Sequence, residues 1–392
     1  MLLSIIVPLY NTEKYIVKCL RSAADQDIPA EDYEIIVVDD GSTDRSGALV
    51  REMTAEHRNI ILIPQPNAGL GMARNTALAQ ARGRYILFLD SDDYLEPNTL
   101  GGLLRIMDEE RLEVLCLNFD RVTPEGTLLE KGPYLVRAEQ NPTGRMRGRD
   151  FLLADRYVVM VYCYIYRRDL LERHSLRMVR TLHEDEEFTP RALFFAQSIR
   201  YVPKVVYHYV AREGSITHNI RFRNRIERLM TMKSLSDFVT EKVEAGDPEV
   251  AAFLRAKIGY FVRSAFQESR GNRKELLTLL RYCRESGLEP LSSPLSGHKR
   301  FLYRHCMPLF LAYCRYRKKL RNGPPARQKA RPCRWCLRQG RNRLKRTGHT
   351  RTLSGFSGSY LCQNFRGFII FSGRRTLSNS SWLISFFSST RS

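Results

Sequence analysis

Four short apolar runs, each followed by a polar turn and a helix-like segment, constrain the fold more than any other feature of the sequence. The runs cover residues 4–7, 33–38, 60–63 and 86–89. Apolar runs of this length between turn residues are typical of buried strands. Strands that alternate with helices indicate a parallel sheet with right-handed crossovers. The sequence therefore predicts an α/β fold, and the carboxyl ends of its strands are where such sheets bind ligands.

The fourth run ends in three acids within four positions, Asp90, Asp92 and Asp93. Carboxylates this close repel one another unless a cation lies among them, and hard oxygen ligands of this kind suit Mg²⁺ or Mn²⁺. The alternative is an acidic turn that caps the next helix. That helix is expected to open at Glu96-Pro97, because proline is well tolerated at a first helical position. The acids alone leave both interpretations open.

The glycine pattern argues against a dinucleotide-binding fold. Such a fold requires G-x-G-x-x-G after the first strand, whereas residues 8–13, PLYNTE, contain no glycine. The G-x-G at residues 69–71 follows the third run and lacks the third glycine. Hydride-transfer chemistry is therefore poorly supported.

Four motifs in the first hundred residues together resemble those of glycosyltransferase family 2. They are SIIVPLYN, VVDDGSTD, NAGLGMARN and FLDSDD, in this order. The resemblance implies a GT-A fold, which is a Rossmann-like nucleotide-sugar-binding domain with a mostly parallel central sheet. It also implies an inverting enzyme that moves a sugar from a nucleotide-sugar donor, with a UDP-sugar as first choice, to a hydroxyl of a glycan or lipid-linked acceptor. The implied pathway is the synthesis of bacterial surface glycans such as capsule, exopolysaccharide or lipopolysaccharide.

The resemblance assigns a role to each matching residue. Asp90-Ser91-Asp92 matches the DXD motif that holds the divalent cation and the ribose, and Asp93 extends it. The predicted metal ligands are therefore Asp92, Asp90 and Asp93. The residues matched to the nucleotide sugar are Pro8, Tyr10, Asp39, Asp40, Asn67, Arg74, Asp90 and Ser91.

Physical chemistry supports several of these assignments. An ionised carboxylate only accepts hydrogen bonds, so Asp40 suits the N–H of a base, with Asp39 beside it. The guanidinium of Arg74 suits a diphosphate. The ring of Tyr10 suits the face of a pyrimidine, and simple core packing is its alternative role.

A catalytic base is expected in the segment LHEDEEF, residues 182–188. By resemblance to the family's ED motif, Asp185 is the base that deprotonates the acceptor hydroxyl, and Glu184 is its neighbour. An acid at a helix N-terminus is held ionised by the helix dipole, which suits a proton acceptor. The alternative is that these acids only stabilise an ordinary first turn. Residues 201–210 are predicted as a further strand, and the following Arg212 lies two positions beyond the place where the family carries an arginine.

Charge divides the rest of the chain. Of the 63 Lys and Arg, 22 lie in residues 290–392, where no acid occurs, which leaves 41 against 42 acids in residues 1–289. The whole net charge of +21 thus belongs to the last quarter. We predict a catalytic domain at 1–221, a helical region at 222–322 and a basic, disordered tail at 323–392.

The basic quarter allows more than one role. Residues 299–321 mix aromatic and basic side chains, a pattern typical of segments that lie on an anionic membrane, although a terminal helix docked on the fold would look the same. The lone C-x-x-C at Cys333 and Cys336 does not favour zinc. The alternative function for the whole chain is a non-catalytic nucleotide-sugar or nucleic-acid binder acting through the tail. The intact DSDD and ED motifs argue against it.

The remaining features concern location. The apolar N-terminus is interrupted by Pro8, so no signal peptide is expected, and no run of eighteen apolar residues indicates a transmembrane helix. The nine cysteines are scattered and odd in number, which favours a reducing compartment. The expected location is the cytoplasm, with peripheral contact on the inner face of the cell membrane.

Overall fold

The computed structural model describes residues 1–132, 144–155, 157–212, 221–269, 272–288, 360–364 and 367–371. By internal contacts the chain divides into two units, Met1–Phe310 and Leu311–Ser392. In the second unit, strands β10 (Tyr360–Asn364) and β11 (Gly367–Phe371) pair in antiparallel fashion. The predicted membrane segment and most of the predicted tail lie outside the described residues, so those expectations remain predictions.

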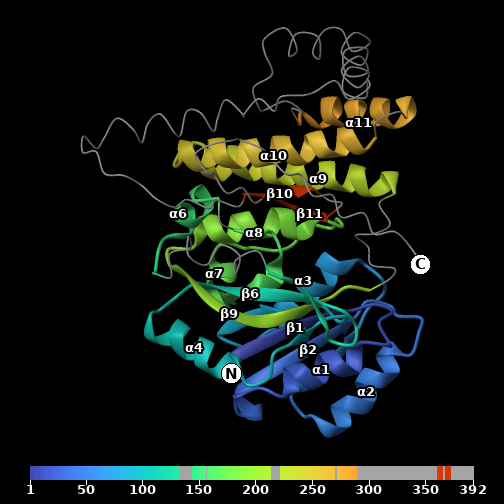
Figure 1. Cartoon of the computed structure of the whole chain (residues 1–392), viewed down its shortest axis with the longest axis vertical. Coiled ribbons are helices and arrows are strands. Elements are labelled where there is room, and N and C mark those ends of the chain that lie inside the picture. The colour runs from blue at the N-terminus through green and yellow to red at the C-terminus, as the bar shows by residue number, and fades with distance from the viewer. Residues whose placement is uncertain are drawn as a thin grey trace, which may run out of the picture. The chain divides into compact units, whose positions relative to one another are not determined.

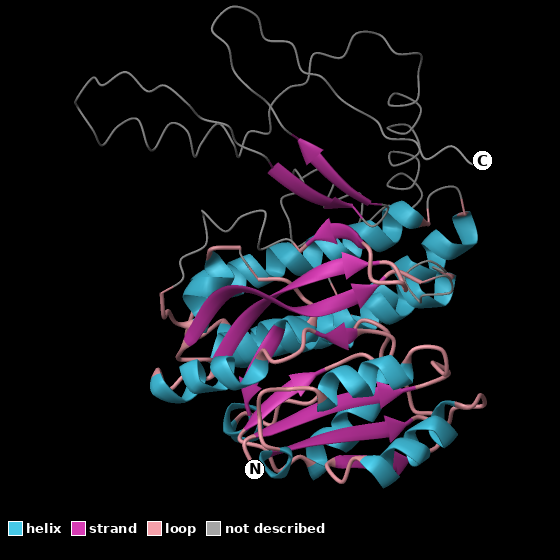
Figure 2. Cartoon of the chain, turned by 60° about the horizontal axis from the view of Figure 1, so that its bottom comes forward, coloured by secondary structure: helices cyan, strands magenta, loops and turns pink. Residues whose placement is uncertain are grey.

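A nine-stranded sheet forms the centre of the first unit (Figure 2). Its strands run, in spatial order, as β3 (Ile60–Pro64), β2 (Tyr33–Asp39), β1 (Leu3–Leu9), β4 (Tyr85–Phe88), β8 (Tyr164–Arg167), β6 (Val114–Val122), β9 (Ile199–Val210) and β5 (Tyr94–Leu95), and β7 (Leu128–Lys131) pairs with β6. The first four are parallel to one another, as predicted. β8 then runs antiparallel to both β4 and β6, which makes the sheet mixed.

Three of the four predicted strands, β1, β2 and β4, are buried on both faces, whereas β3 at the edge of the sheet is only partly buried. Ile5 of β1 pairs with Ile35 of β2 and with Leu87 of β4, and all three side chains are inaccessible to solvent. Two-sided burial explains why these strands read as continuous apolar runs rather than alternating ones. Each such side chain contributes about 1.5–3 kcal/mol of hydrophobic stabilisation. The core therefore fixes the register that brings the strand ends together.

Helices pack on both faces of this sheet. Those between the strands are α1 (Ile16–Ala24), α2 (Ser46–Glu56), α3 (Leu70–Gln80), α4 (Leu100–Glu109), α6 (Gly148–Leu153), α7 (Arg168–Arg173) and α8 (Glu184–Phe195), with single 3₁₀ turns at Ala30–Asp32 and Val161–Cys163. One face of α1 packs into the core, since Ile16, Cys19, Leu20 and Ala23 are all buried.

One predicted helix start is wrong. Residues after the acidic cluster first form the short strand β5, and α4 begins only at Leu100. The backbone N–H of Glu96 donates to the carbonyl of Val206 at 2.8 Å, which ties this residue to β9. Asn98 then adopts a φ of +52°, a left-handed conformation that interrupts a helix. Pairing with a distant strand thus overrides the local proline signal.

Three long helices follow β9: α9 (Phe222–Phe238), α10 (Pro248–Glu268) and α11 (Arg273–Ser286), and α9 continues into a π-helical turn at Val239–Val243. Figure 1 shows them stacked on the side of α8 that faces away from the sheet. α10 begins with a local cap, because the Asp247 side chain accepts from the Val250 N–H and Pro248 occupies the first turn. Within the described part of the chain, no helix has the length and apolar character needed to cross a membrane.

Candidate functional site

The carboxyl ends of β1, β2 and β4 lie side by side because the three strands are parallel neighbours. Leu9 pairs with Asp39, and the N–H of Asp40 donates to the Leu9 carbonyl at 2.9 Å. The hydroxyl of Thr12 donates to the Ser91 hydroxyl at 3.0 Å, which ties the first turn to the fourth. The fold therefore brings the first, second and fourth motifs to one edge of the sheet, where open α/β sheets bind ligands.

Asp40 organises the turn that precedes α3. Its carboxylate accepts hydrogen bonds from Gln65 Nε2 at 2.7 Å and from the backbone N–H groups of Ala68 and Gly69, each at 2.8 Å. The amide of Asn67 donates to the Asp40 carbonyl at 2.9 Å. A carboxylate offers about four acceptor positions. Three are thus used by the loop, which leaves room for one further donor such as a base N–H.

The other predicted nucleotide residues differ in accessibility. Pro8 is buried in β1, whereas the side chain of Tyr10 is 49% exposed, so Tyr10 is not a core residue. Asn67 is exposed beside the third turn. Asp39 accepts the N–H of Ser42 at 2.9 Å and lies against Gly47, where an added Cβ would approach its Oδ2 to 2.4 Å. Asp39 thus shapes the start of α2.

Arg74, which the sequence assigns to the nucleotide sugar, pairs with two carboxylates. It is buried in α3, and its guanidinium bridges Asp90 Oδ1 and Glu184 Oε1, each at 2.5 Å. Burial alone would lower the pKa of Arg74, but the charges of Asp90 and Glu184 raise it. The guanidinium expected at the diphosphate therefore joins the predicted metal motif to the predicted ED motif, which lie far apart in the sequence.

The contacts of the acidic cluster decide which of its carboxylates could hold a metal. Asp93 is buried, and its two oxygens accept from the Tyr207 hydroxyl at 2.5 Å and from the Val210 N–H at 2.7 Å. Asp92 is only partly buried and pairs through Oδ2 with Arg212 Nε at 2.5 Å. The described residues contain no group of three or more His, Cys, Asp or Glu arranged to hold a metal. Asp90 and Asp92 fit instead a cation that is bound by one or two carboxylates and completed by substrate phosphates.

Asp185 lies in the first turn of α8, where its Oδ1 accepts the N–H of Glu186 at 2.8 Å. Burial raises the pKa of Asp185 well above its usual value, and the neighbouring Glu184 and Glu186 raise it further. This shift runs in the direction opposite to the one expected from the helix dipole, because desolvation and two adjacent carboxylates disfavour the charged form.

Two contributors were missed or doubted in the sequence. The hydroxyl of Tyr207 donates to Asp93 and accepts from the backbone N–H of Asp90, with 3.2 Å between the Asp90 nitrogen and the Tyr207 oxygen. Arg212, displaced by two positions from the family arginine, nonetheless reaches Asp92, and its guanidinium lies 5.6 Å from the Tyr15 ring centroid. The signal for both was the YHYVAR stretch, whose partners lie more than a hundred residues away.

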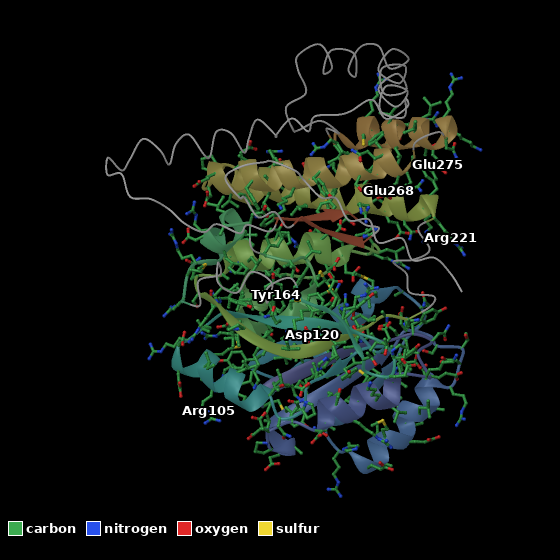
Figure 3. All side chains as sticks on the ribbon, in the orientation of Figure 1. Arg105, Asp120, Tyr164, Arg221, Glu268 and Glu275 are labelled. Atoms are coloured by element: carbon green, nitrogen blue, oxygen red, sulfur yellow. The ribbon has the colours of Figure 1, made fainter. Side chains whose placement is uncertain are left out.

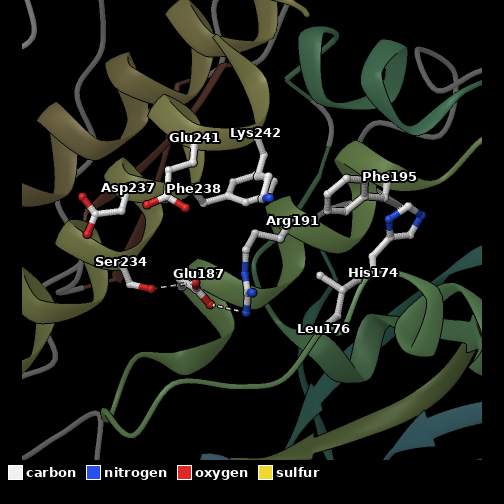
Figure 4. Close-up of a pocket in the computed structure, with 10 residues that line it drawn as sticks. All are labelled: His174, Leu176, Glu187, Arg191, Phe195, Ser234, Asp237, Phe238, Glu241 and Lys242. Carbon is white, nitrogen blue, oxygen red and sulfur yellow. Dashed lines mark hydrogen bonds and ion pairs between the residues drawn. The ribbon is translucent and has the colours of Figure 1, made fainter. Parts of the chain in front are cut away.

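A pocket of about 280 Å³ lies elsewhere, between α8 and α9 (Figure 4). The Glu187 carboxylate accepts from Ser234 at 2.9 Å and pairs with Arg191 at 2.7 Å there. None of the predicted site residues lines it; its lining is His174, Leu176, Glu187, Arg191, Phe195, Ser234, Asp237, Phe238, Glu241 and Lys242. The candidate site is therefore the strand-end cluster.

Comparison with solved structures identifies the class of fold. The first 349 residues of Staphylococcus aureus TarS, solved with UDP, align with a TM-score of 0.63 at 23% identity, covering 84% of this chain and 94% of that one. The same TarS fragment solved with UDP-GlcNAc aligns with a TM-score of 0.62 at 24% identity. This likeness shows that the fold is of the GT-A type.

Sequence comparison identifies the family. The model of glycosyl transferase family 2 matches residues 4–175. EpsH of Bacillus subtilis, which is named as a glycosyltransferase, is 31% identical over 257 residues, which is 64% of this chain and 73% of EpsH. The poly(ribitol-phosphate) β-N-acetylglucosaminyltransferase TarS of S. aureus is 34% identical over 216 residues, 54% of this chain and 36% of the longer protein. The chain belongs to glycosyl transferase family 2 and is a glycosyltransferase.

Proposed function

We propose that this glycosyltransferase is an inverting, metal-dependent enzyme that moves a sugar from a UDP-sugar to a hydroxyl of a glycan or lipid-linked acceptor during the synthesis of a cell-surface polysaccharide. The observation that carries the proposal is the Arg74 bridge between Asp90 and Glu184. Through Arg74, Asp90 of the proposed donor site is linked directly to Glu184, the residue next to Asp185.

The donor is assigned from two sources. The related TarS fragment was solved with UDP and with UDP-GlcNAc, so its site takes a uridine nucleotide. In this chain, the exposed ring of Tyr10 and the remaining acceptor position on Asp40 suit the face and the N–H of a pyrimidine base. Pro8, Asp39, Asn67 and Ser91 complete the proposed nucleotide pocket.

The divalent cation, Mg²⁺ or Mn²⁺, would be held by Asp90 and Asp92 together with diphosphate oxygens, and it would neutralise the negative charge that develops on the leaving nucleotide. Asp93 supports the cluster by fixing its turn to β9 through Tyr207 and Val210. Arg212 offers a second positive charge beside Asp92.

Asp185 is the proposed base. Burial and the neighbouring acids raise the pKa of Asp185 above that of an ordinary aspartate, which makes its carboxylate a stronger acceptor for the proton of the acceptor hydroxyl. The acceptor oxygen then attacks the anomeric carbon on the face opposite the leaving diphosphate. A single displacement inverts the configuration and needs no covalent nucleophile.

Donor binding tests the proposal. UDP-, GDP- and dTDP-sugars are titrated calorimetrically into the wild type, Asp92→Asn and Asp169→Asn, with and without Mg²⁺ or Mn²⁺. Asp169 is a matched control because it is also an aspartate paired with an arginine, Arg167 at 3.0 Å. It lies on α7, outside the strand-end cluster. We expect metal-dependent binding of a UDP-sugar that Asp92→Asn weakens at least tenfold and Asp169→Asn preserves. Equal binding by both variants, or binding independent of metal, contradicts it.

A further inference from the structure

Helix α9 holds the segment that leads into α8. Thr181 and Thr231 share a hydrogen bond of 2.7 Å between their hydroxyls. The backbone N–H of Leu182 donates to Glu227 Oε2 at 3.1 Å. Two successive residues before the ED turn are thus fixed by side chains of α9 that lie 50 and 45 positions further along the sequence.

The same helix reaches into the turn itself. Arg228 of α9 is buried, and its Nε lies 3.7 Å from Glu186 Oε1, while its Nη1 lies 3.5 Å from Glu268 Oε1 of α10. The imidazole of His183 also contacts this cluster, with its Nδ1 3.5 Å from Glu186 Oε1. Burial, with the Arg228 charge adding to it, lowers the pKa of His183 to about 3. Arg228 is therefore the cation that faces Glu186 from α9.

Asp185 stands between two buried arginine–glutamate pairs. Glu184 is hydrogen-bonded to Arg74 of α3 at 2.5 Å, and Glu186 faces the guanidinium of Arg228 of α9 at 3.7 Å. Residues two apart on a helix point to nearly opposite sides. The two pairs therefore contact the first turn of α8 from opposite sides. They restrict both rotation of this turn about the helix axis and displacement of Asp185.

We infer that α9, through Arg228, is a positioning element of the catalytic turn that sets where Asp185 meets the acceptor hydroxyl. The inference rests on the proposed role of Asp185 as base. It gives the helical region a part in catalysis, although this region lies beyond the residues 4–175 that the family model matches. Arg228 itself touches no reacting atom and acts through Glu186.

Arg225 supplies a matched control. It lies on the same helix and is also mostly buried, but it pairs with Glu275 at 2.6 Å and Glu268 at 3.6 Å, away from α8 (both glutamates are labelled in Figure 3). Loss of Arg225 thus breaks partly buried ion pairs between α9, α10 and α11, while Glu268, which Arg225 shares with Arg228, keeps its pair with Arg228 and the Glu186 contact stays in place. It separates a loss of stability from a loss of positioning.

The experiment measures kcat, the donor KM and the melting temperature of the full-length wild type, Arg228→Gln, Arg228→Lys and Arg225→Gln with a UDP-sugar and Mn²⁺. We expect Arg228→Gln to lower kcat by about 10- to 100-fold, because misplacement of a reacting group costs this much. Its donor KM should stay within about twofold because the strand-end site is intact. Arg228→Lys, which keeps the charge, should recover part of kcat, and Arg225→Gln should lower the melting temperature without lowering kcat more than about twofold.

The outcomes separate clearly. If Arg228→Gln is folded and keeps the kcat of Arg225→Gln, the inference is overturned. If Arg228→Gln does not fold, the double variant Arg228→Met with Glu186→Leu removes both charges together, and a wild-type kcat in that variant overturns the inference as well.

Asp185→Asn is measured in the same assay. If it transfers sugar at the wild-type rate, the proposed function fails rather than the positioning role. If it is inactive while Arg228→Gln is fully active, only the inference on α9 fails.

Discussion

Replacement of Arg74 by methionine probes the buried bridge most directly. The guanidinium is 3% exposed, Glu184 is 3% exposed and Asp90 is 23% exposed. Removing one partner of a fully buried ion pair costs about 3–5 kcal/mol, because the other charge is left without compensation. Glu184 meets that description, whereas solvent screens Asp90 and reduces its share. We therefore expect Arg74→Met to lower the free energy of unfolding by about 3–5 kcal/mol, a large part of a typical 5–15 kcal/mol.

The assay is thermal and urea unfolding followed by circular dichroism, with the m-value checked for two-state behaviour. A loss of this size corresponds to a drop in melting temperature of about 6–20 °C. Arg84→Met is the control, because Arg84 pairs with Asp108 at 2.6 Å while both side chains are well exposed, at 59% and 39%. An exposed pair contributes about 0–1 kcal/mol. The reasoning is refuted if Arg74→Met destabilises the protein no more than Arg84→Met does.

Three further predictions concern stability. Gly69 has a φ of +97°, so Gly69→Ala should lower the free energy of unfolding by about 1–3 kcal/mol, measured by thermal unfolding. Gly102 lies inside α4 with open space around an added Cβ, so Gly102→Ala should raise it by about 0.5–1 kcal/mol. Equal effects of the two substitutions would contradict this. Asp93→Leu should cost about 1–3 kcal/mol for each of the two donors left buried, measured by urea unfolding, and Asp93→Asn, which keeps an acceptor, should cost less. Burial raises the pKa of Glu186 to about 7, so its contribution to stability is complete below about pH 4.5 and is lost as pH rises through about 7; the stability of the wild type relative to Glu186→Gln should therefore fall across that window, and a rise would refute the assignment.

The fold was predictable where local pattern and burial agree. The strands β1, β2 and β4 form continuous apolar runs because both faces of each strand are covered by the core, whereas β3 at the edge is an apolar run that is only partly buried. The first and fourth motifs lie at the same edge of the sheet because their strands are parallel. The alternation of strands and helices already implies parallel strands. The break before α10 was visible because Asp247 and Pro248 form a local cap.

The details that escaped the sequence depend on partners far along the chain. Glu96 was expected to open a helix, but its N–H is taken by β9. The pairing of Arg74 with Asp90 and with the buried Glu184, two carboxylates from separate segments, could not be read from the sequence. The helix dipole led us to expect a low pKa for Asp185. The expectation left out burial and the proximity of Glu184 and Glu186, which raise this pKa and are visible only in the folded structure. Long-range ion pairs have no local signature, so only the folded structure assigns them.

The most direct test of the central claim is the rate of sugar transfer from a UDP-sugar by Asp185→Asn, with product formation followed by NMR so that the anomeric configuration is read in the same experiment. Asp169→Asn, an aspartate likewise in the first turn of its helix, is the control. The account predicts an inverted product from the wild type and the control, and a transfer rate reduced by about 10²- to 10⁴-fold in Asp185→Asn. Transfer at the control rate by Asp185→Asn, or retention of configuration in the wild-type product, would contradict it.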